Sequence, residues 1–345
     1  MSPHGPGAAE PTRHGLGDPR VPWVVLLDLR WSSPPPADGL KTRLDAVAAL
    51  AGWSPPGSGA VRSGRCAELL AALATSTTEP LRIGRYDDGI VLAARHDALD
   101  GLALLTAARL LLGADLRSSA RGLAPSATAG GAAAVLRRLS EVAFRPPARV
   151  APGTRAETPG DVFAATTLVG TFRTADLVLA GARAVGDWNR EHGATSRRTS
   201  VAIGASTLGG EADTLGDASA FLRLTDVETM TADQVRAAMS SAPVQPGGST
   251  SGRSHVLGAV VGAGLRIAAP RLGSTLLVSH LGTLTAPDEL AAAAFYPVTG
   301  GGSGLSLGAA GVGGSTTITL RARAARYDDN ALQSLLERVA ANVVR

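Results

Sequence analysis

The sequence predicts an α/β protein made of two lobes, each a mixture of strands and helices. Strand-like apolar runs alternate along the chain with segments whose apolar residues keep helical spacing. The chain has 345 residues and is 45% hydrophobic, which is enough for two units that each bury a core or for one large domain. Prolines at 146–147 and a Pro-Gly pair at 152–153 mark the boundary between the two lobes.

The first lobe is expected over residues 21–150, after a disordered Pro- and Gly-containing tail over 1–20. A buried strand is predicted over 23–29, and the proline run at 34–36 then forces an extended connection. Two helices should follow. Their apolar stripes are Leu40, Leu44, Val47 and Leu50, then Cys66, Leu69, Leu70 and Leu73.

A hairpin is predicted next, because the Asp-Gly pair at 88–89 favours a tight turn between two strands. Its second strand ends at His96, and a leucine-rich helix over 102–112 follows a short polar turn. Asp97 or Asp100 should cap that helix, since a carboxylate accepts free backbone N–H groups and meets the positive end of the helix dipole. His96 is therefore expected at the mouth of a strand–turn–helix, four residues before a carboxylate.

The second lobe is expected over 151–345, after a flexible loop over 117–134. Its predicted helices run from just after Asp161 to Trp188, from a cap at Thr231 to Met239, and through a closing apolar stripe over 332–339. Its predicted strands cover 198–206, 220–224, 272–284, 304–308 and 316–321, with a loop over 246–254.

The His96-x-x-x-Asp100-Gly101 motif resembles the H-x-x-x-D-G motif of the chloramphenicol-acetyltransferase-like superfamily. This group includes nonribosomal peptide condensation domains, polyketide-associated acyltransferases and wax-ester synthases. Leu-Gly-Asp at 215–217 is similar to the family's Leu-Gly-Asn, and Ser-His-Leu-Gly at 279–282 to its Ser-Asn-x-Gly. The resemblance implies two lobes that form a V, with a channel at their interface.

The same resemblance implies a stand-alone condensation-like acyltransferase of natural-product or lipid biosynthesis. His96 would be the general base, Asp100 would shape its loop through a salt bridge, and Gly101 would let the substrates approach the helix start. Ser279 would donate a hydrogen bond to the oxyanion, although an ordinary strand-end hydroxyl is the competing interpretation.

No metal and no tightly bound cofactor are implied. Acyl-coenzyme A or a phosphopantetheine thioester would be the co-substrate, and a small amine or alcohol the acceptor. An acyl or peptidyl carrier protein would be the partner.

Several departures favour an alternative, a non-catalytic condensation-like scaffold that binds a carrier protein or another assembly-line partner. Arg95 replaces the first of the two histidines that many condensation domains carry. Ser206 and Thr207 stand where an arginine often pairs with the motif aspartate, and Arg30 or Arg198 could substitute for it. The Asp-Phe-Gly-Trp-Gly motif is absent, and the chain is shorter than most members.

Composition argues against other function classes. Aromatic residues make up only 3% and the net charge is +4 on scattered arginines, so no nucleic-acid partner is expected. Apolar stretches are short and interrupted, so we expect no stable membrane insertion and a cytoplasmic location. A wax-ester-type enzyme at a lipid surface lacks the support of a basic amphipathic helix. Gly304-x-Ser306-x-Gly308 matches the hydrolase nucleophile elbow, but no histidine follows it. Cys66, the only cysteine, is expected to be a buried thiol.

Overall fold

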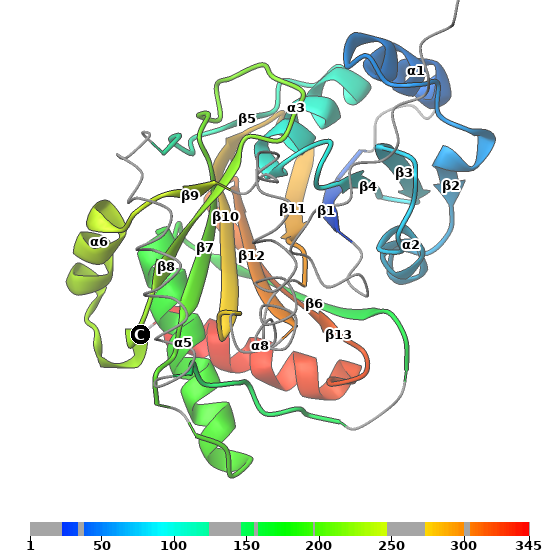
Figure 1. The fold of residues 1–345 in the computed structure, drawn as a ribbon. Coiled ribbons are helices and arrows are strands. Elements are labelled where there is room, and N and C mark those ends of the chain that lie inside the picture. The colour runs from blue at the N-terminus through cyan, green and yellow to red at the C-terminus, as the bar shows by residue number, and fades with distance from the viewer. Residues whose placement is uncertain are drawn as a thin grey trace, which may run out of the picture.

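The computed structural model describes residues 23–33, 38–123, 146–154, 158–195, 197–246, 273–299 and 304–344. Within them lie two β-sheets with helices packed on their faces (Figure 1). The predicted tail over 1–20 and most of the predicted loops over 117–134 and 246–254 lie outside the described residues. In the part of the chain that is described, no helix is both long and apolar enough to cross a bilayer.

The smaller sheet has the strand order β11-β1-β4-β3-β2. Its strands are β1 (Val24–Trp31), β2 (Val61–Ser63), β3 (Leu81–Tyr86), β4 (Gly89–Arg95) and β11 (Leu290–Tyr296). The helices of this lobe are α1 (Leu40–Leu50), α2 (Cys66–Leu73) and α3 (Gly101–Leu112), with a 3₁₀ turn over Ser58–Ala60. The predicted strand, two helices, hairpin and third helix are all confirmed in this order.

The larger sheet has the order β6-β13-β12-β10-β7-β8-β9, and β5 pairs with the end of β10. Its strands are β5 (Arg117–Ser118), β6 (Asp161–Val169), β7 (Val201–Ser206), β8 (Ser219–Leu224), β9 (Gln245–Pro246), β10 (Leu276–Thr285), β12 (Leu305–Val312) and β13 (Ser315–Arg323). Its helices are α5 (Thr174–Glu191), α6 (Ala232–Ser241) and α8 (Asp329–Val343), with a 3₁₀ turn over Val227–Thr229. Helices α5 and α8 lie against one face of this sheet (Figure 1).

The prediction of one helix from just after Asp161 to Trp188 is wrong in its first part. Residues 161–169 form the edge strand β6, and the helix α5 begins only at Thr174. Every residue of β6 pairs in antiparallel register with β13, from Asp161 with Arg323 to Val169 with Ser315. Ala164 and Ala165 suit a helix, but β-branched neighbours and this tertiary pairing decide for the strand.

A strand of the second half of the sequence, β11, belongs to the first sheet. It pairs with β1, from Leu26 with Tyr296 to Trp31 with Leu290. It also passes close to β12: a Cβ on Gly308 would lie only 1.9 Å from the Phe295 carbonyl oxygen, so only a glycine fits there. The division into 21–150 and 151–345 therefore does not follow the sheets everywhere. Strand β11 comes from the second range but lies in the smaller sheet, and β5 comes from the first range but pairs with β10 of the larger sheet.

One apolar core contains side chains of both lobes. In β1, Val25, Leu27 and Leu29 point into the core that contains α1 and α3, whereas Val24 and Leu26 pack against α2 on the opposite face. Side chains of β10, β11 and β12 complete the first of these cores: Leu281, Leu284, Ala293, Phe295, Ala310 and Val312. The junction between the lobes is thus packed side chain against side chain.

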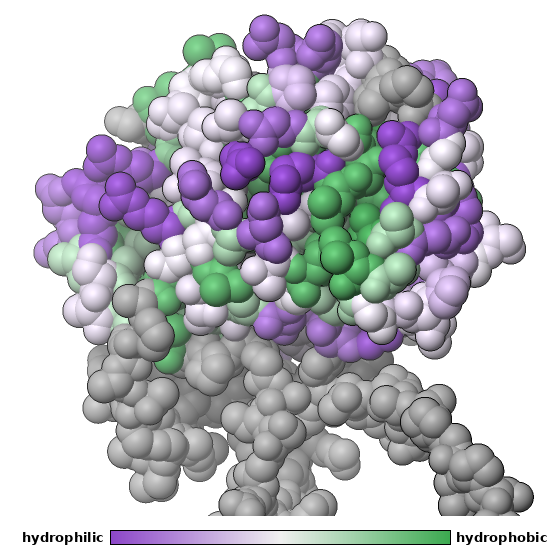
Figure 2. All heavy atoms as spheres, turned by 90° about the horizontal axis from the view of Figure 1, so that it is seen from above, coloured by the Kyte–Doolittle hydropathy of each residue, from purple (hydrophilic) through white to green (hydrophobic). Residues whose placement is uncertain are grey.

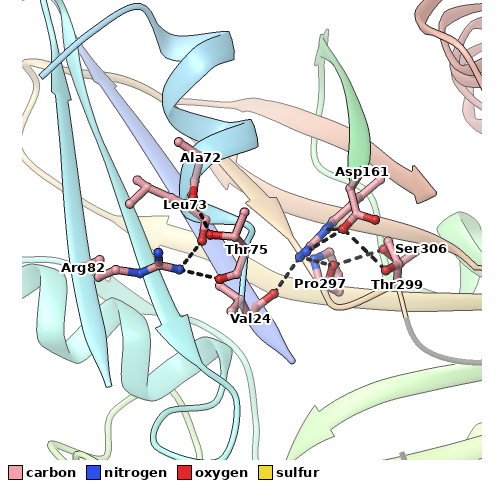
Figure 3. A network of polar contacts seen from close by, with 10 residues as sticks. Val24, Ala72, Leu73, Thr75, Arg82, Asp161, Pro297, Thr299 and Ser306 are labelled. Atoms are coloured by element: carbon pink, nitrogen blue, oxygen red, sulfur yellow. Dashed lines mark hydrogen bonds and ion pairs between the residues drawn. The ribbon is translucent and has the colours of Figure 1, made fainter. Parts of the chain in front are cut away.

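A buried ion pair ties the lobes together at a second point (Figure 3). Arg321 of β13 is fully buried; its Nε lies 2.8 Å and its Nη2 2.7 Å from Asp161 Oδ2. Its Nη1 donates to the carbonyl oxygens of Val24 at 2.6 Å and Pro297 at 3.2 Å. One guanidinium therefore binds β6, the start of β1 and the segment that leaves β11. Burial lowers the pKa of Arg321 and the Asp161 carboxylate opposes that change.

The outer surface of the molecule carries apolar side chains among charged ones. Seen from above, one face shows a hydrophobic area within a hydrophilic surround (Figure 2). Helices α1 and α3 lie on this side of the molecule (Figure 1), and each exposes a leucine, Leu50 at 70% and Leu110 at 36%. The apolar faces of these helices therefore extend beyond the side that packs in the core.

Candidate functional site

His96 lies where β4 ends and the loop to α3 begins. Its backbone N–H donates to the Trp23 carbonyl oxygen at 2.8 Å, which fixes the turn to the start of β1. The side chain is 22% exposed, yet Nδ1 is buried and has no hydrogen-bond partner among the described residues. The exposed part of the ring must therefore be its other edge. Asp217 Oδ1, in the loop before β8, lies 4.0 Å from Nδ1.

Asp100 caps α3, which settles the choice between Asp97 and Asp100. Its Oδ1 accepts the Ala103 N–H at 2.8 Å, and its Oδ2 accepts the Ala218 N–H at 3.2 Å. The Asp100 N–H in turn donates to the Gly216 carbonyl oxygen at 3.3 Å. The buried carboxylate thus holds the helix start of one lobe against a loop of the other.

No arginine pairs with Asp100 among the described residues. The carboxylate has backbone donors instead, and Arg30 pairs with Asp88 at 3.7 Å. The backbone N–H of Arg198 donates to the Glu228 carboxylate, and its backbone has a positive φ of 63°. Two backbone hydrogen bonds therefore satisfy the buried carboxylate in place of the expected salt bridge.

Gly101 begins α3 at a close contact between the lobes. A Cβ at this position would lie 2.9 Å from Leu281 Cδ2 of β10 and 2.9 Å from Phe295 Cζ of β11. Both distances are shorter than a carbon–carbon contact allows, so any larger residue would force these two packed side chains to shift. The structure gives Gly101 a packing reason that spacing in the sequence did not show.

Arg95 and Asp97 flank His96 and form an ion pair. Arg95 Nε donates to Asp97 Oδ1 at 2.9 Å, its Nη2 reaches Asp97 Oδ2, and Nη1 donates to the Thr78 carbonyl oxygen at 3.1 Å. Asp97 is therefore held by Arg95 and does not cap the helix. The residue that replaces the first histidine has a structural role in the turn.

Ser279 lies on the face of β10 that looks toward the first lobe. Its neighbours Leu277 and Leu281 pack against the shared core, and its Oγ is 3.2 Å from where a Cβ of Gly204 would lie. His280 points to the other face, where its Nδ1 is 3.3 Å from Thr174 Oγ1 at the start of α5. The structure thus places Ser279, and not His280, on the side of the lobe junction.

Two other candidates from the sequence have structural roles. Ser306 is fully buried within β12, where its Oγ donates to the Pro297 carbonyl oxygen at 3.2 Å, so the Gly-x-Ser-x-Gly pattern lies in a strand and not in an elbow. Cys66 is half-buried with its Sγ 3.7 Å from Asp28 Oδ2, and burial raises the pKa of the thiol to about 12. Such a thiol stays protonated near neutral pH and is a poor nucleophile.

Asp217 lies beside His96, a placement that the Leu-Gly-Asp match in the sequence did not predict. It differs from the asparagine of the Leu-Gly-Asn pattern, and that acidic residue in an otherwise matching tripeptide was the available signal. Within the described ranges, no group of three His, Cys, Asp or Glu side chains is arranged to hold a metal ion. The site is thus an imidazole with one carboxylate beside it and a second carboxylate that braces the loop.

No protein-family model and no curated protein sequence matches this chain. Several solved structures match it in fold. The nonribosomal peptide synthetase cyclization-docking bidomain EpoB from Sorangium cellulosum is similar with a TM-score of 0.55 and 12% identity, covering 95% of this chain and 82% of that one. The first condensation domain of the CDA synthetase is similar with a TM-score of 0.55 and 14% identity, covering 94% and 91%.

A further solved structure is the first condensation domain of the calcium-dependent antibiotic synthetase in complex with a substrate analogue. It is similar with a TM-score of 0.54 and 14% identity, over 94% of this chain and 91% of that one. At this level of identity the likeness concerns the fold. The chain has the two-lobe chloramphenicol-acetyltransferase-like fold that condensation domains of nonribosomal peptide synthetases adopt.

Proposed function

We propose that this protein is a condensation-like acyltransferase that moves an acyl group from a thioester to an amine or alcohol, with His96 as general base. The observation that carries the proposal is the placement of His96 at the junction of two lobes with the condensation-domain fold. Its imidazole is held at a strand end with one edge buried and the other open. A general base needs this combination of fixed position and access to the substrate.

The chemistry would proceed in two steps. His96 Nε2 would take the proton of the acceptor N–H or O–H as that atom attacks the thioester carbonyl carbon, giving a tetrahedral oxyanion. The oxyanion would then collapse, the C–S bond would break, and the imidazolium would return the proton to the leaving thiolate. Ser279 faces the same junction, and we propose it as a hydrogen-bond donor to the oxyanion.

The remaining residues of the motif have structural parts in this proposal. Asp100 holds the loop to α3 and to the segment over 216–218, and Gly101 allows the lobes to approach. The acyl donor would be acyl-coenzyme A or a phosphopantetheine thioester on a carrier protein, with no tightly bound cofactor. A channel leading to His96, stand-alone activity and a cytoplasmic location remain predictions.

The test compares acyl transfer by wild type and His96→Ala with a panel of acyl thioesters, amines and alcohols, read by mass spectrometry. A positioned base contributes about a hundredfold to ten-thousandfold, so His96→Ala should fold normally and lose turnover by such a factor. Ser306→Ala, which changes the serine of the Gly-x-Ser-x-Gly pattern in β12, should retain far more activity. A folded His96→Ala variant with the wild-type rate contradicts the proposal. A wild type that transfers nothing yet binds a carrier protein supports the non-catalytic scaffold instead.

A further inference from the structure

The contact between His96 and Asp217 joins an imidazole of one lobe to a carboxylate of the other. The geometry points to Asp217 as a positioning residue: its carboxylate keeps the proton of the neutral imidazole on Nδ1, so that Nε2 is the basic nitrogen. The two atoms Nδ1 and Oδ1 lie 4.0 Å apart, at the limit for an ion pair and beyond the distance of a hydrogen bond.

The position of Asp217 is fixed from both sides. Its preceding neighbour, Gly216, accepts the Asp100 N–H at 3.3 Å, and its following neighbour, Ala218, donates to Asp100 Oδ2 at 3.2 Å. Asp217 Oδ1 itself accepts the Ser219 N–H at 3.0 Å and also the Ser219 hydroxyl. The carboxylate therefore cannot turn away from His96 without losing these hydrogen bonds.

The two tautomers of His96 differ in what they present to this carboxylate. A neutral imidazole carries its proton on one nitrogen and a lone pair on the other. A lone pair on buried Nδ1 would face a negative charge and have no donor among the described residues. A proton there faces the negative carboxylate 4.0 Å away, and this attraction does not need a hydrogen bond. The Nδ1–H tautomer is thus favoured, and the basic Nε2 lies on the edge of the ring away from Asp217.

This arrangement also assigns a purpose to Asp100. By holding Gly216 and Ala218, its backbone and carboxylate bring Asp217 to the loop that bears His96. The consequence for rate rests on the proposed function of His96 as a base. The consequence for the tautomer does not, so the two can be tested separately.

The direct test is nitrogen-15 NMR of histidine-labelled full-length protein near pH 9, where neutral imidazoles show distinct protonated and unprotonated nitrogen signals. The chain has 6 histidines, and the His96 signals are assigned by their absence in His96→Gln. Wild type should show protonated Nδ1 and unprotonated Nε2. Asp217→Ala should shift the ratio toward the Nε2–H tautomer, and the isosteric Asp217→Asn should shift it less.

The matched control is Asp213→Ala, which removes a carboxylate from the same loop. Asp213 is 61% exposed and pairs with Arg109 at 2.6 Å, so its loss should leave the His96 signals unchanged. An Nε2–H tautomer in the wild type overturns the inference. An unchanged tautomer ratio in both Asp217 variants overturns it as well. Asp217→Asn keeps an acceptor for Ser219, so this variant remains a valid test even if Asp217→Ala disturbs the loop.

Kinetics give the second readout. For a reaction that the wild type performs, Asp217→Ala should lower kcat by about tenfold to a hundredfold with little change in KM, less than the loss of the base itself. If the wild type performs no acyl transfer but its tautomer responds to Asp217, the proposed function fails and the positioning role stands. If transfer occurs and the tautomer does not respond, the positioning role alone fails.

Discussion

His280 offers a quantitative test of how this fold buries a titratable side chain. It points from β10 toward the start of α5, with Nδ1 3.3 Å from Thr174 Oγ1. Burial lowers its pKa from the ordinary 6.5 to about 4. Between these two values the unfolded chain binds a proton that the folded chain does not, so stability falls as the pH drops from 6.5 toward 4.

The magnitude follows from the two pKa values. At 1.36 kcal/mol per pH unit, the full contribution approaches about 3 kcal/mol, and between pH 7 and pH 5 the protein should lose about 2 kcal/mol from this group. The prediction is therefore a steeper acid destabilisation than the same chain shows without this histidine.

The assay is denaturant unfolding of wild type and His280→Asn at pH 7 and pH 5. Comparing the two pH values within each protein cancels the packing cost of the substitution, and the variant should lose about 2 kcal/mol less than wild type on acidification. Thr174→Val is the control: it removes the hydroxyl beside Nδ1 but keeps the burial, so the steep pH dependence should remain. Parallel pH dependence in wild type and His280→Asn refutes the reasoning.

Two further predictions concern buried carboxylates at the lobe junction. Asp100→Ala removes a helix cap and leaves the Ala218 N–H unpaired, so it should cost about 2–4 kcal/mol, and a melting temperature equal to wild type would count against this role. Asp161→Asn leaves the fully buried Arg321 without its counter-charge and should cost about 3–5 kcal/mol in chemical denaturation. Its control is Asp187→Asn, which breaks an exposed pair within α5 and should cost less than about 1 kcal/mol; equal losses in both variants would contradict the distinction.

Local chemistry determined most of the first lobe. The apolar run before His96, the Asp-Gly turn and the leucine spacing after it are short-range signals, and each predicted element formed. The cap at Asp100 belongs to the same class, because a carboxylate before a helix meets free N–H groups within three residues. Sequence alone therefore places His96 at a strand–turn–helix.

Pairing between distant segments decided what local preference could not. The alanine-rich β11 favours a helix by composition, yet it becomes a strand because β1 offers it an edge and Gly308 allows it to cross β12. The same holds for β6, whose alanines are overridden by full pairing with β13. In both cases the deciding partner is far away in the sequence, so no local pattern contains the information.

The residues of the site also fall into those placed by local sequence and those placed by tertiary packing. The sequence determined that His96, Asp100 and Gly101 stand together, because their spacing is local. Only the tertiary structure brought Asp217 to within 4.0 Å of the imidazole, since that contact depends on how the loop before β8 packs against the start of α3. It also showed that Leu281 and Phe295 pack directly against Gly101, although their strands lie almost two hundred residues further along the chain. Contacts between lobes are set by packing of the whole chain, and that is why the structure was needed to find them.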